Sequence, residues 1–293
     1  MTSTVRVITP NRLEMRSVFD EKRAARRGLA VGAAGLIALT GCGTGDAAAE
    51  EQVHVPEDAA VEELSVEVLE TYDHDADSFT QGLELREHPE FGPVLYESAG
   101  LYSESDVRIT DPATGKVLAS QDLPAEQFAE GLTLTDADLW QITWQEGIAH
   151  RRDPVSLDIV ESVAYEGEGW GICYDGERLV MSDGSSTLTF RDPVTFEETG
   201  TVEVALDGEP VHQINELECV DGQVWANLWQ TDQIVRIDPA TGEVGAVVDA
   251  AGLLSEEQAG GADVLNGIAA AEEEGTFYLT GKHWPKLFLV KFV

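Results

Sequence analysis

The sequence has few basic residues. It contains 18 lysines and arginines against 55 aspartates and glutamates among 293 residues, which gives a net charge of −37. Residues 1–41 hold seven of the basic and three of the acidic residues, so the rest has 11 basic and 52 acidic residues and a net charge of −41. Phosphate binding needs clustered cations, so this composition disfavours nucleic acid and anionic lipid headgroups as partners, and we expect no binding of nucleic acid. We expect the charge to serve solubility, with attraction of cationic peptides as the functional alternative.

Hydrophobic runs long enough to cross a membrane are also missing. The apolar run GLAVGAAGLIAL, at residues 28–39, has twelve residues, whereas a spanning helix needs about 20. It follows a basic segment, Lys22 to Arg27, and ends in LTGC, Leu39 to Cys42. This order resembles a bacterial lipobox and predicts a lipoprotein signal peptide at 1–41, cleavage before Cys42 and acylation of its thiol. The expected product is a cell-membrane lipoprotein on the extracytoplasmic face, and an ordinary or twin-arginine signal peptide is the alternative.

Cysteine is scarce, with three residues in the whole chain. Cys173 and Cys219 remain after acylation of Cys42, and an extracytoplasmic location permits a disulfide between them. They stand one residue out of step in neighbouring sequence repeats, so their side chains are expected on opposite sheet faces. We therefore predict two buried thiols. Residues 42–63 are small and acidic without hydrophobic periodicity, and we interpret them as a flexible tether.

A repeat of about 45 residues follows. Asp-Pro dipeptides recur at intervals of 39 to 46, beginning at Asp111, Asp153, Asp192 and Asp238. Five segments can be aligned, each with three runs typical of strands, and the first four have a fourth run after the Asp-Pro turn. This pattern predicts an all-β fold over residues 64–293, namely a five-bladed β-propeller with four-stranded antiparallel blades. A non-circular β-sandwich is the alternative.

The fifth segment lacks its outer strand. The N-terminal segment ELSVEVLETY, residues 63–72, has alternating apolar residues and no partner within its own repeat. We expect it to pair with the last blade and close the ring, because closure removes an exposed edge that would invite aggregation.

Two sets of equivalent positions carry unusual residues. The first ring contains Gln81, Glu130, Trp170, Asn215 and Asn266. A core position would be aliphatic in every blade. The second ring contains Gly100, Trp144, Gly184, Trp229 and Lys282. Any one of them alone favours interblade packing or bound water, but together they have the composition of a small ligand pocket.

The segments FTQGL, FAEGLT, LWQITWQEG, GEGWGICYDG, INELE, ANLWQTDQIVRIDP and LTGKHWP resemble those of the plant and bacterial glutaminyl-peptide cyclotransferases. The similarity runs from Phe79 to the C-terminus. It implies a five-bladed propeller enzyme that converts N-terminal glutamine of peptides or proteins to pyroglutamate and releases ammonia. It also implies that no metal or organic cofactor is needed, and the six scattered histidines have no paired spacing typical of zinc sites.

The resemblance also implies site residues. The FTQ segment supplies Phe79 and Gln81, and the FAEG segment supplies Phe128 and Glu130. Pocket walls correspond to Trp144, Trp170 and Trp229, and the remaining polar positions are Asn215, Asn266 and Lys282. We expect Glu130 to shuttle a proton from the attacking amine to the leaving amide. Lys282, Asn215 and Gln81 are the candidate donors to the oxyanion, and the sequence leaves open which of them makes that contact.

Two other functions compete with this hypothesis. A non-enzymatic surface propeller would bind peptides or an envelope partner through the aromatic pocket and would need neither Glu130 nor Lys282. A metal-dependent propeller hydrolase, such as a lactonase, would need several carboxylates or histidines around its metal. We expect a monomer, since nothing in the sequence indicates obligate assembly.

Overall fold

The structure is a computed structural model, and it describes residues 60–293. These residues form 22 β-strands and no helix, so the predicted all-β class is confirmed. No helix that could cross a membrane is present in this part of the chain. The signal peptide, Cys42 and nearly all of the predicted tether lie outside the described residues.

Three four-stranded antiparallel sheets follow one another along the chain. The first contains β2 (Thr80–His88), β3 (Gly92–Ala99), β4 (Asp106–Asp111) and β5 (Lys116–Asp122). The second contains β6 (Ala129–Leu134), β7 (Leu139–Thr143), β8 (Ile148–Arg152) and β9 (Ile159–Ala164). The third contains β10 (Ile172–Tyr174), β11 (Leu179–Met181), β12 (Thr187–Arg191) and β13 (Glu198–Glu203). A small hairpin, β14 (Ala205–Leu206) and β15 (Glu209–Pro210), comes next.

The remaining strands form one eight-stranded sheet. Its members are β16 (Ile214–Val220), β17 (Gln223–Leu228), β18 (Gln233–Ile237), β19 (Val244–Asp249), β20 (Leu265–Ala270), β21 (Thr276–Gly281), β22 (Lys286–Phe292) and β1 (Glu62–Asp73). Strand β1 lies in the middle of this sheet. Its first residues pair in parallel with β19, and its remainder pairs antiparallel with β22. The strand begins two residues before the start predicted for the folded domain.

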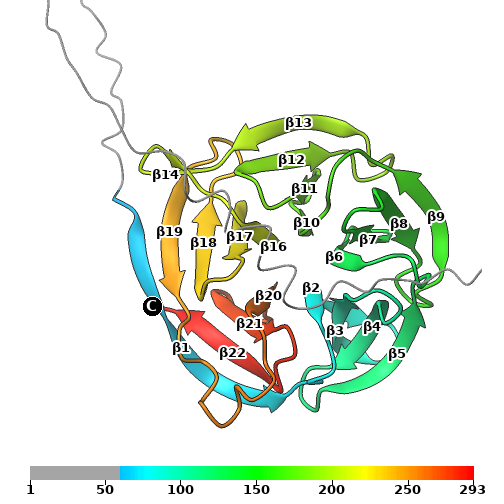
Figure 1. Cartoon of the computed structure of the whole chain (residues 1–293), viewed down its shortest axis with the longest axis horizontal. Helices are drawn as coiled ribbons and strands as arrows, with labels where there is room; N and C mark the ends of the chain where they lie inside the picture. The colour runs from blue at the N-terminus through cyan, green and yellow to red at the C-terminus, as the bar shows by residue number, and fades with distance from the viewer. Residues whose placement is uncertain (1–59) are drawn as a thin grey trace, which may run out of the picture. The chain divides into compact units, whose positions relative to one another are not determined.

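The sheets are arranged around a common centre, with β2, β6, β10, β16 and β20 innermost (Figure 1). Glycines allow these inner strands to approach one another. A Cβ on Gly131 would lie 2.8 Å from the amide nitrogen of Ile172, and one on Gly82 would lie 2.5 Å from that of Leu132. The glycine that recurs along the inner strands is therefore required by close backbone packing.

The recurring Asp-Pro turns join the third strand of a sheet to the fourth. In each turn the aspartate side chain accepts a hydrogen bond from the amide two residues later, as between Asp153 Oδ1 and Val155 at 2.8 Å. Such a bond stabilises a turn locally, which explains why the same dipeptide marks the same place in four repeats.

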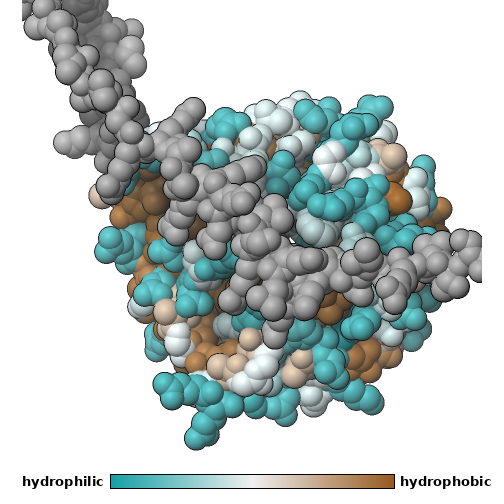
Figure 2. Space-filling model, viewed as in Figure 1, coloured by the Kyte–Doolittle hydropathy of each residue, from teal (hydrophilic) through white to brown (hydrophobic). Residues whose placement is uncertain are grey.

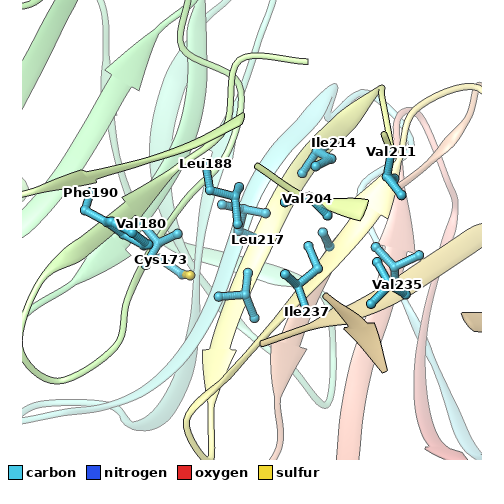
Figure 3. Packing of buried hydrophobic residues seen from close by; sticks show 13 residues of the cluster. Cys173, Val180, Leu188, Phe190, Val204, Val211, Ile214, Leu217, Val235 and Ile237 are labelled. Atoms are coloured by element: carbon cyan, nitrogen blue, oxygen red, sulfur yellow. The ribbon is translucent and has the colours of Figure 1, made fainter. Parts of the chain in front are cut away.

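A hydrophobic cluster fills the space between the third sheet and the β16–β19 strands. It contains Leu188 and Phe190 from one side and Leu217, Val235 and Ile237 from the other (Figure 3). Hydrophilic side chains are spread over much of the described surface (Figure 2).

The prediction of two free thiols was wrong, because Cys173 and Cys219 form a disulfide with their Cα atoms 5.4 Å apart. Cys173 lies on β10 and Cys219 on β16, the inner strands of neighbouring sheets. Neighbouring sheets pack with one face of the first sheet against the opposite face of the second. Two equivalent positions would point the same way, so residues that meet across the interface must differ by one position along the strand. Cys173 and Cys219 differ in this way, and their side chains therefore meet.

Candidate active site

β-Bulges occur at the first-ring position in four inner strands. The strand pairing shifts register between Thr80 and Gly82, Ala129 and Leu132, Ile214 and Leu217, and Leu265 and Ile268. Gln81, Glu130, Asn215 and Asn266 lie inside these shifts. A bulge re-aims a side chain out of the regular alternation. The four positions therefore share the same local backbone feature, a bulge near the start of the inner strand. The fifth first-ring residue, Trp170, lies before the start of β10.

Backbone hydrogen bonds connect the two predicted rings. The amides of Gly100, Trp144, Trp229 and Lys282 donate to the carbonyls of Phe79, Phe128, Gln213 and Val264 at 2.8 to 3.0 Å. Each acceptor lies two residues before a first-ring residue. In each of these four sheets, the acceptor, the first-ring residue and the second-ring residue therefore lie close together at one end of the strands. In the remaining sheet, the position two residues before Trp170 is Glu168.

Glu130 is 5% exposed and takes part in a short chain of polar groups. Gln81 donates from Nε2 to Glu130 Oε1 at 3.0 Å, and Asn266 donates from Nδ2 to Gln81 Oε1 at 3.4 Å. Burial raises the pKa of Glu130 well above its usual range. The Lys282 ammonium opposes this rise, while the carboxylates of Glu168 and Glu146 add to it.

Lys282 is 4% exposed, and its Nζ lies 4.8 Å from the centre of the Phe79 ring. Burial lowers the pKa of Lys282 to about 8, although Glu130 and Asp263 favour its charged form. The site therefore contains a carboxyl group with a raised pKa and an amine with a lowered one.

A wall of aromatic rings begins at Phe79. Its ring stands edge to face with that of Phe128 at a centroid distance of 6.0 Å, and Phe128 meets Trp144 at 5.6 Å. A Cβ on Gly100 would lie 2.5 Å from the Phe128 ring, so the glycine in the second ring makes room for it. Tyr102 also contacts Phe128, at 5.4 Å.

The segment around Phe79 is held by a buried carboxylate. Ser78 and Thr80, on either side of Phe79, both donate their hydroxyls to Glu97 Oε1, at 2.5 and 2.7 Å. His74 also contacts this oxygen, at 3.2 Å. Burial raises the pKa of Glu97, but His74, Arg108 and Ser78 outweigh this effect and lower it to about 2, so the group remains ionised.

A second part of the wall consists of Trp170 and Trp229. Their rings stand edge to face, with centroids 5.4 Å apart. Gly184 has a φ of +80°, and a Cβ there would lie 2.6 Å from the Trp170 ring. The two indoles of Trp144 and Trp170 both donate to Glu168 Oε2, at 2.9 and 3.1 Å.

The two asparagines differ in their surroundings. Asn266 is fully buried, and its amide also donates to the Thr80 carbonyl at 3.0 Å. Asn215 is 3% exposed, and its Oδ1 is buried with no hydrogen-bond partner among the described residues. Asn266 therefore orients Gln81 through its amide nitrogen, and its Oδ1, like that of Asn215, is buried with no hydrogen-bond partner among the described residues.

Contacts connect the predicted residues into two groups. Asn266, Gln81 and Glu130 form the polar chain, and Lys282 joins the aromatic wall through Phe79. Sequence reasoning missed three members of the site: Tyr102, Glu146 and Glu168. Tyr102 donates to Glu146 Oε1 at 2.9 Å, and the Phe128 amide donates to Glu146 Oε2 at 3.3 Å. The spacing of two residues before the first ring could have drawn attention to Glu168.

A cavity of about 400 Å³ lies away from this group, and Glu84, Glu218 and the disulfide cysteines help to line it. None of the ring residues lines it. Within residues 60–293, no cluster of three or more His, Cys, Asp or Glu side chains is suited to holding a metal ion.

The site can therefore combine proton transfer with binding of an organic group. Glu130 supplies a buried proton acceptor or donor, Lys282 a buried cation, and the rings an apolar surface. Acyl transfer of an amide can use such a proton donor, because a poor leaving group must be protonated as it departs.

Comparisons with known proteins agree with this chemistry. Residues 36–292 match the family model described as glutamine cyclotransferase. A glutaminyl-peptide cyclotransferase of Arabidopsis thaliana is 39% identical over 234 residues, which are 77% of this chain and 71% of the relative. The crystal structure of Myxococcus xanthus glutaminyl cyclase is 36% identical, with a TM-score of 0.70, and the match covers 80% of this chain and 98% of that one. The chain therefore belongs to the glutamine cyclotransferase family of enzymes.

Proposed function

We propose that this chain is a glutaminyl-peptide cyclotransferase, which converts N-terminal glutamine of peptides or proteins to pyroglutamate and releases ammonia. The observation that carries the proposal is the buried Glu130 carboxyl, which receives a hydrogen bond from Gln81 beside an aromatic wall. The activity named for the Arabidopsis relative and for the Myxococcus structure supports it.

Glu130 is the proton shuttle in this proposal. The α-amine nitrogen of the substrate attacks the Cδ of its own glutamine side chain, which forms the ring bond and a tetrahedral intermediate. Protonated Glu130 gives its proton to the departing nitrogen, the bond from Cδ to that nitrogen breaks, and ammonia leaves. The Glu130 carboxylate then takes the proton from the ring nitrogen, so its initial state is restored. The raised pKa of Glu130 supports this order, because it keeps the group protonated into a higher pH range.

The oxyanion of the intermediate needs a donor. Lys282 is our candidate, because it is a cation in a buried site and electrostatic stabilisation is stronger away from water. Asn215 is the second candidate, since it is buried at a first-ring position and its side-chain NH₂ group can donate a hydrogen bond. Gln81 donates to Glu130, and we assign it the role of orienting that carboxyl.

The aromatic residues bind the substrate in this proposal. Folding the glutamine side chain over its own amine brings the reacting atoms together, and confinement between rings favours that conformation. Phe79, Phe128, Trp144, Trp170 and Trp229 are the candidate contacts. Asn266 acts through Gln81, because it is fully buried behind it.

We further propose that the fold is a five-bladed propeller closed by its N-terminal strand. The blades are the three four-stranded sheets, the β16–β19 strands, and β20–β22 completed by β1. The pairing of β1 with both β22 and β19 supports this interpretation.

The location of the protein is also a proposal. The lipobox at Leu39 to Cys42 supports a lipoprotein anchored by Cys42 at the extracytoplasmic face of a bacterial cell membrane. The disulfide is consistent with this, since disulfides persist in oxidising compartments. We propose a monomer, which acts on peptides and not on nucleic acid.

Ammonia release from glutaminyl dipeptides tests the function, with asparaginyl and N-acetylated glutaminyl dipeptides as controls. We expect release from the first substrate only, and the same rate with a chelator present. No release would support a peptide-binding protein without activity, and release that a chelator abolishes would support a metal enzyme.

A further inference from the structure

Glu168 lies between the two halves of the aromatic wall. Phe128 and Trp144 form one edge-to-face pair, and Trp170 and Trp229 form the other. Trp144 and Trp170 come from neighbouring sheets, and both donate from Nε1 to the same oxygen of Glu168, at 2.9 and 3.1 Å. One carboxylate oxygen therefore joins both pairs into a continuous surface.

The other oxygen of Glu168 is also occupied. Gln145 donates from Nε2 to Glu168 Oε1 at 3.0 Å. The backbone next to Glu168 is fixed as well, because the Gly169 amide donates to the Trp144 carbonyl at 2.9 Å and the Trp170 amide to the Ser182 carbonyl at 3.0 Å. The carboxylate is thus held in place before any substrate arrives.

Position 168 is equivalent to two residues of the wall. It stands two residues before its first-ring residue, as Phe79 and Phe128 do in their sheets. Those two residues contribute rings to the wall directly. At the third equivalent position Glu168 has no ring to add to the wall. Its carboxylate instead accepts hydrogen bonds from the indoles of Trp144 and Trp170.

The indoles need such an acceptor. Trp144 and Trp170 are only half-buried, so without Glu168 each Nε1–H could turn toward water and the ring could adopt another rotamer. A hydrogen bond to a charged acceptor is stronger than one between neutral groups. Two such bonds to one atom fix the orientation of the rings relative to each other.

We propose that Glu168 is a positioning residue that holds the indoles of Trp144 and Trp170 in the orientation that binds the N-terminal glutamine of the substrate. This inference rests on the proposed function. It assigns to Glu168 a role in substrate binding through the two indoles, with no part in proton transfer.

Three variants separate hydrogen bonding from volume. Glu168→Gln keeps an acceptor oxygen for both indoles, and the Gln145 amide can rotate to present its own oxygen to the new NH₂ group. Glu168→Leu keeps the volume and removes the acceptor. Glu166→Leu makes the same chemical change at an exposed glutamate two residues away, which is not the hydrogen-bond acceptor of either indole. Thermal unfolding checks that all three remain folded.

Steady-state kinetics with a glutaminyl dipeptide give the first test. We expect Glu168→Leu to raise KM about ten-fold and to change kcat less than about three-fold, because misoriented walls weaken binding more than chemistry. Glu168→Gln should stay within about three-fold of the wild-type KM, and Glu166→Leu should equal the wild type. A wild-type KM in Glu168→Leu, or equal damage in Glu168→Gln and Glu168→Leu, would overturn the inference.

Near-ultraviolet circular dichroism gives a test that needs no turnover. We expect Glu168→Leu to change the tryptophan signal and Glu168→Gln to retain it. If the wild type releases no ammonia, the proposed function fails while this measurement still decides whether Glu168 orients the indoles. If the wild type is active and the three variants share its spectrum and KM, the inference alone fails.

Discussion

At the scale of single residues, Glu130 and Lys282 influence each other. The ammonium of Lys282 limits the rise in the pKa of Glu130, and the carboxylate of Glu130 limits the fall in that of Lys282. Burial is the larger effect for both groups, so the two pKa values move toward each other. A neutral carboxyl and a cationic amine then coexist over a wider pH range than in water.

This arrangement predicts a bell-shaped pH dependence of kcat/KM. The rising limb belongs to the substrate α-amine, which becomes nucleophilic as it loses its proton at a pKa of about 7.7–8.0. The falling limb belongs to Lys282, which loses its charge as the pH rises through about 8, and to Glu130, which enters the reaction protonated. Lys282→Met should be slower at every pH and should keep only the falling limb set by Glu130, moved to higher pH because the ammonium that lowers the pKa of Glu130 is gone. A falling limb at an unchanged pH in the variant would contradict the role of Lys282.

The ring residues could be predicted because each repeat places equivalent residues at the same point of its inner strand. Gln81, Glu130 and Asn215 stand out there, since a core position would be aliphatic. Glu146 could not be predicted in the same way, and for Glu168 the spacing indicates only the position. The contacts of both side chains depend on rotamers and cross from one sheet to the next, which sequence spacing does not encode.

At the scale of strands, the bulges explain how polar residues reach the site. A bulge adds one residue to the inner strand and shifts the phase of its alternation, but each of these bulges begins at the first residue of its strand, so too few residues precede it for the shift to be visible in the sequence. The glycine beside the bulge does carry information. Gly131 follows Glu130 and lies against the backbone of β10.

Replacing Gly131 tests this packing. A Cβ there would lie 2.8 Å from Ile172 N and 2.9 Å from Gly171 Cα, and backbone atoms cannot move aside cheaply. We expect Gly131→Ala to lower the free energy of unfolding by about 1–3 kcal/mol in a urea titration. Gly260→Ala is the control, since nothing lies within 4 Å of its Cβ position, and it should have almost no effect. Equal stability of the two variants would contradict close packing of the inner strands.

The disulfide joins two inner strands across 46 residues of sequence. Closing a loop of this length restricts the unfolded chain, and the chain-entropy model gives about 4 kcal/mol as its contribution. We expect the double variant Cys173→Ser, Cys219→Ser to unfold at a lower temperature than the wild type. A reducing agent should lower the Tm of the wild type and leave the variant unchanged. No difference between oxidised and reduced wild type would show that the bond contributes nothing.

At the scale of the whole molecule, the N-terminal strand is the least local element. Its partners in β22 and β19 lie at the other end of the sequence. The antiparallel pairing with the last repeat could be predicted, because that repeat lacks an outer strand. The parallel pairing with β19 could not, because only four residues of β1 take part and the sequence has no separate signal for them.

Two truncations test the importance of this strand. Removing residues 1–59 leaves β1 intact and should leave the Tm unchanged. Removing residues 1–73 exposes the edges of β22 and β19, so we expect a lower Tm and aggregation. Light scattering and thermal unfolding measure both. A stable, monomeric product without β1 would mean that the strand is not needed to close the fold.

The most direct test of the proposed mechanism is the rate of ammonia release by Glu130→Gln on a glutaminyl dipeptide. The change keeps the shape of the side chain and a possible hydrogen bond with Gln81, but it removes the group that transfers the proton. We predict an unchanged Tm and a fall in kcat of about 10²–10⁴, the usual contribution of positioned acid–base catalysis. A folded variant with a kcat close to that of the wild type would contradict the assignment of Glu130 as the proton shuttle.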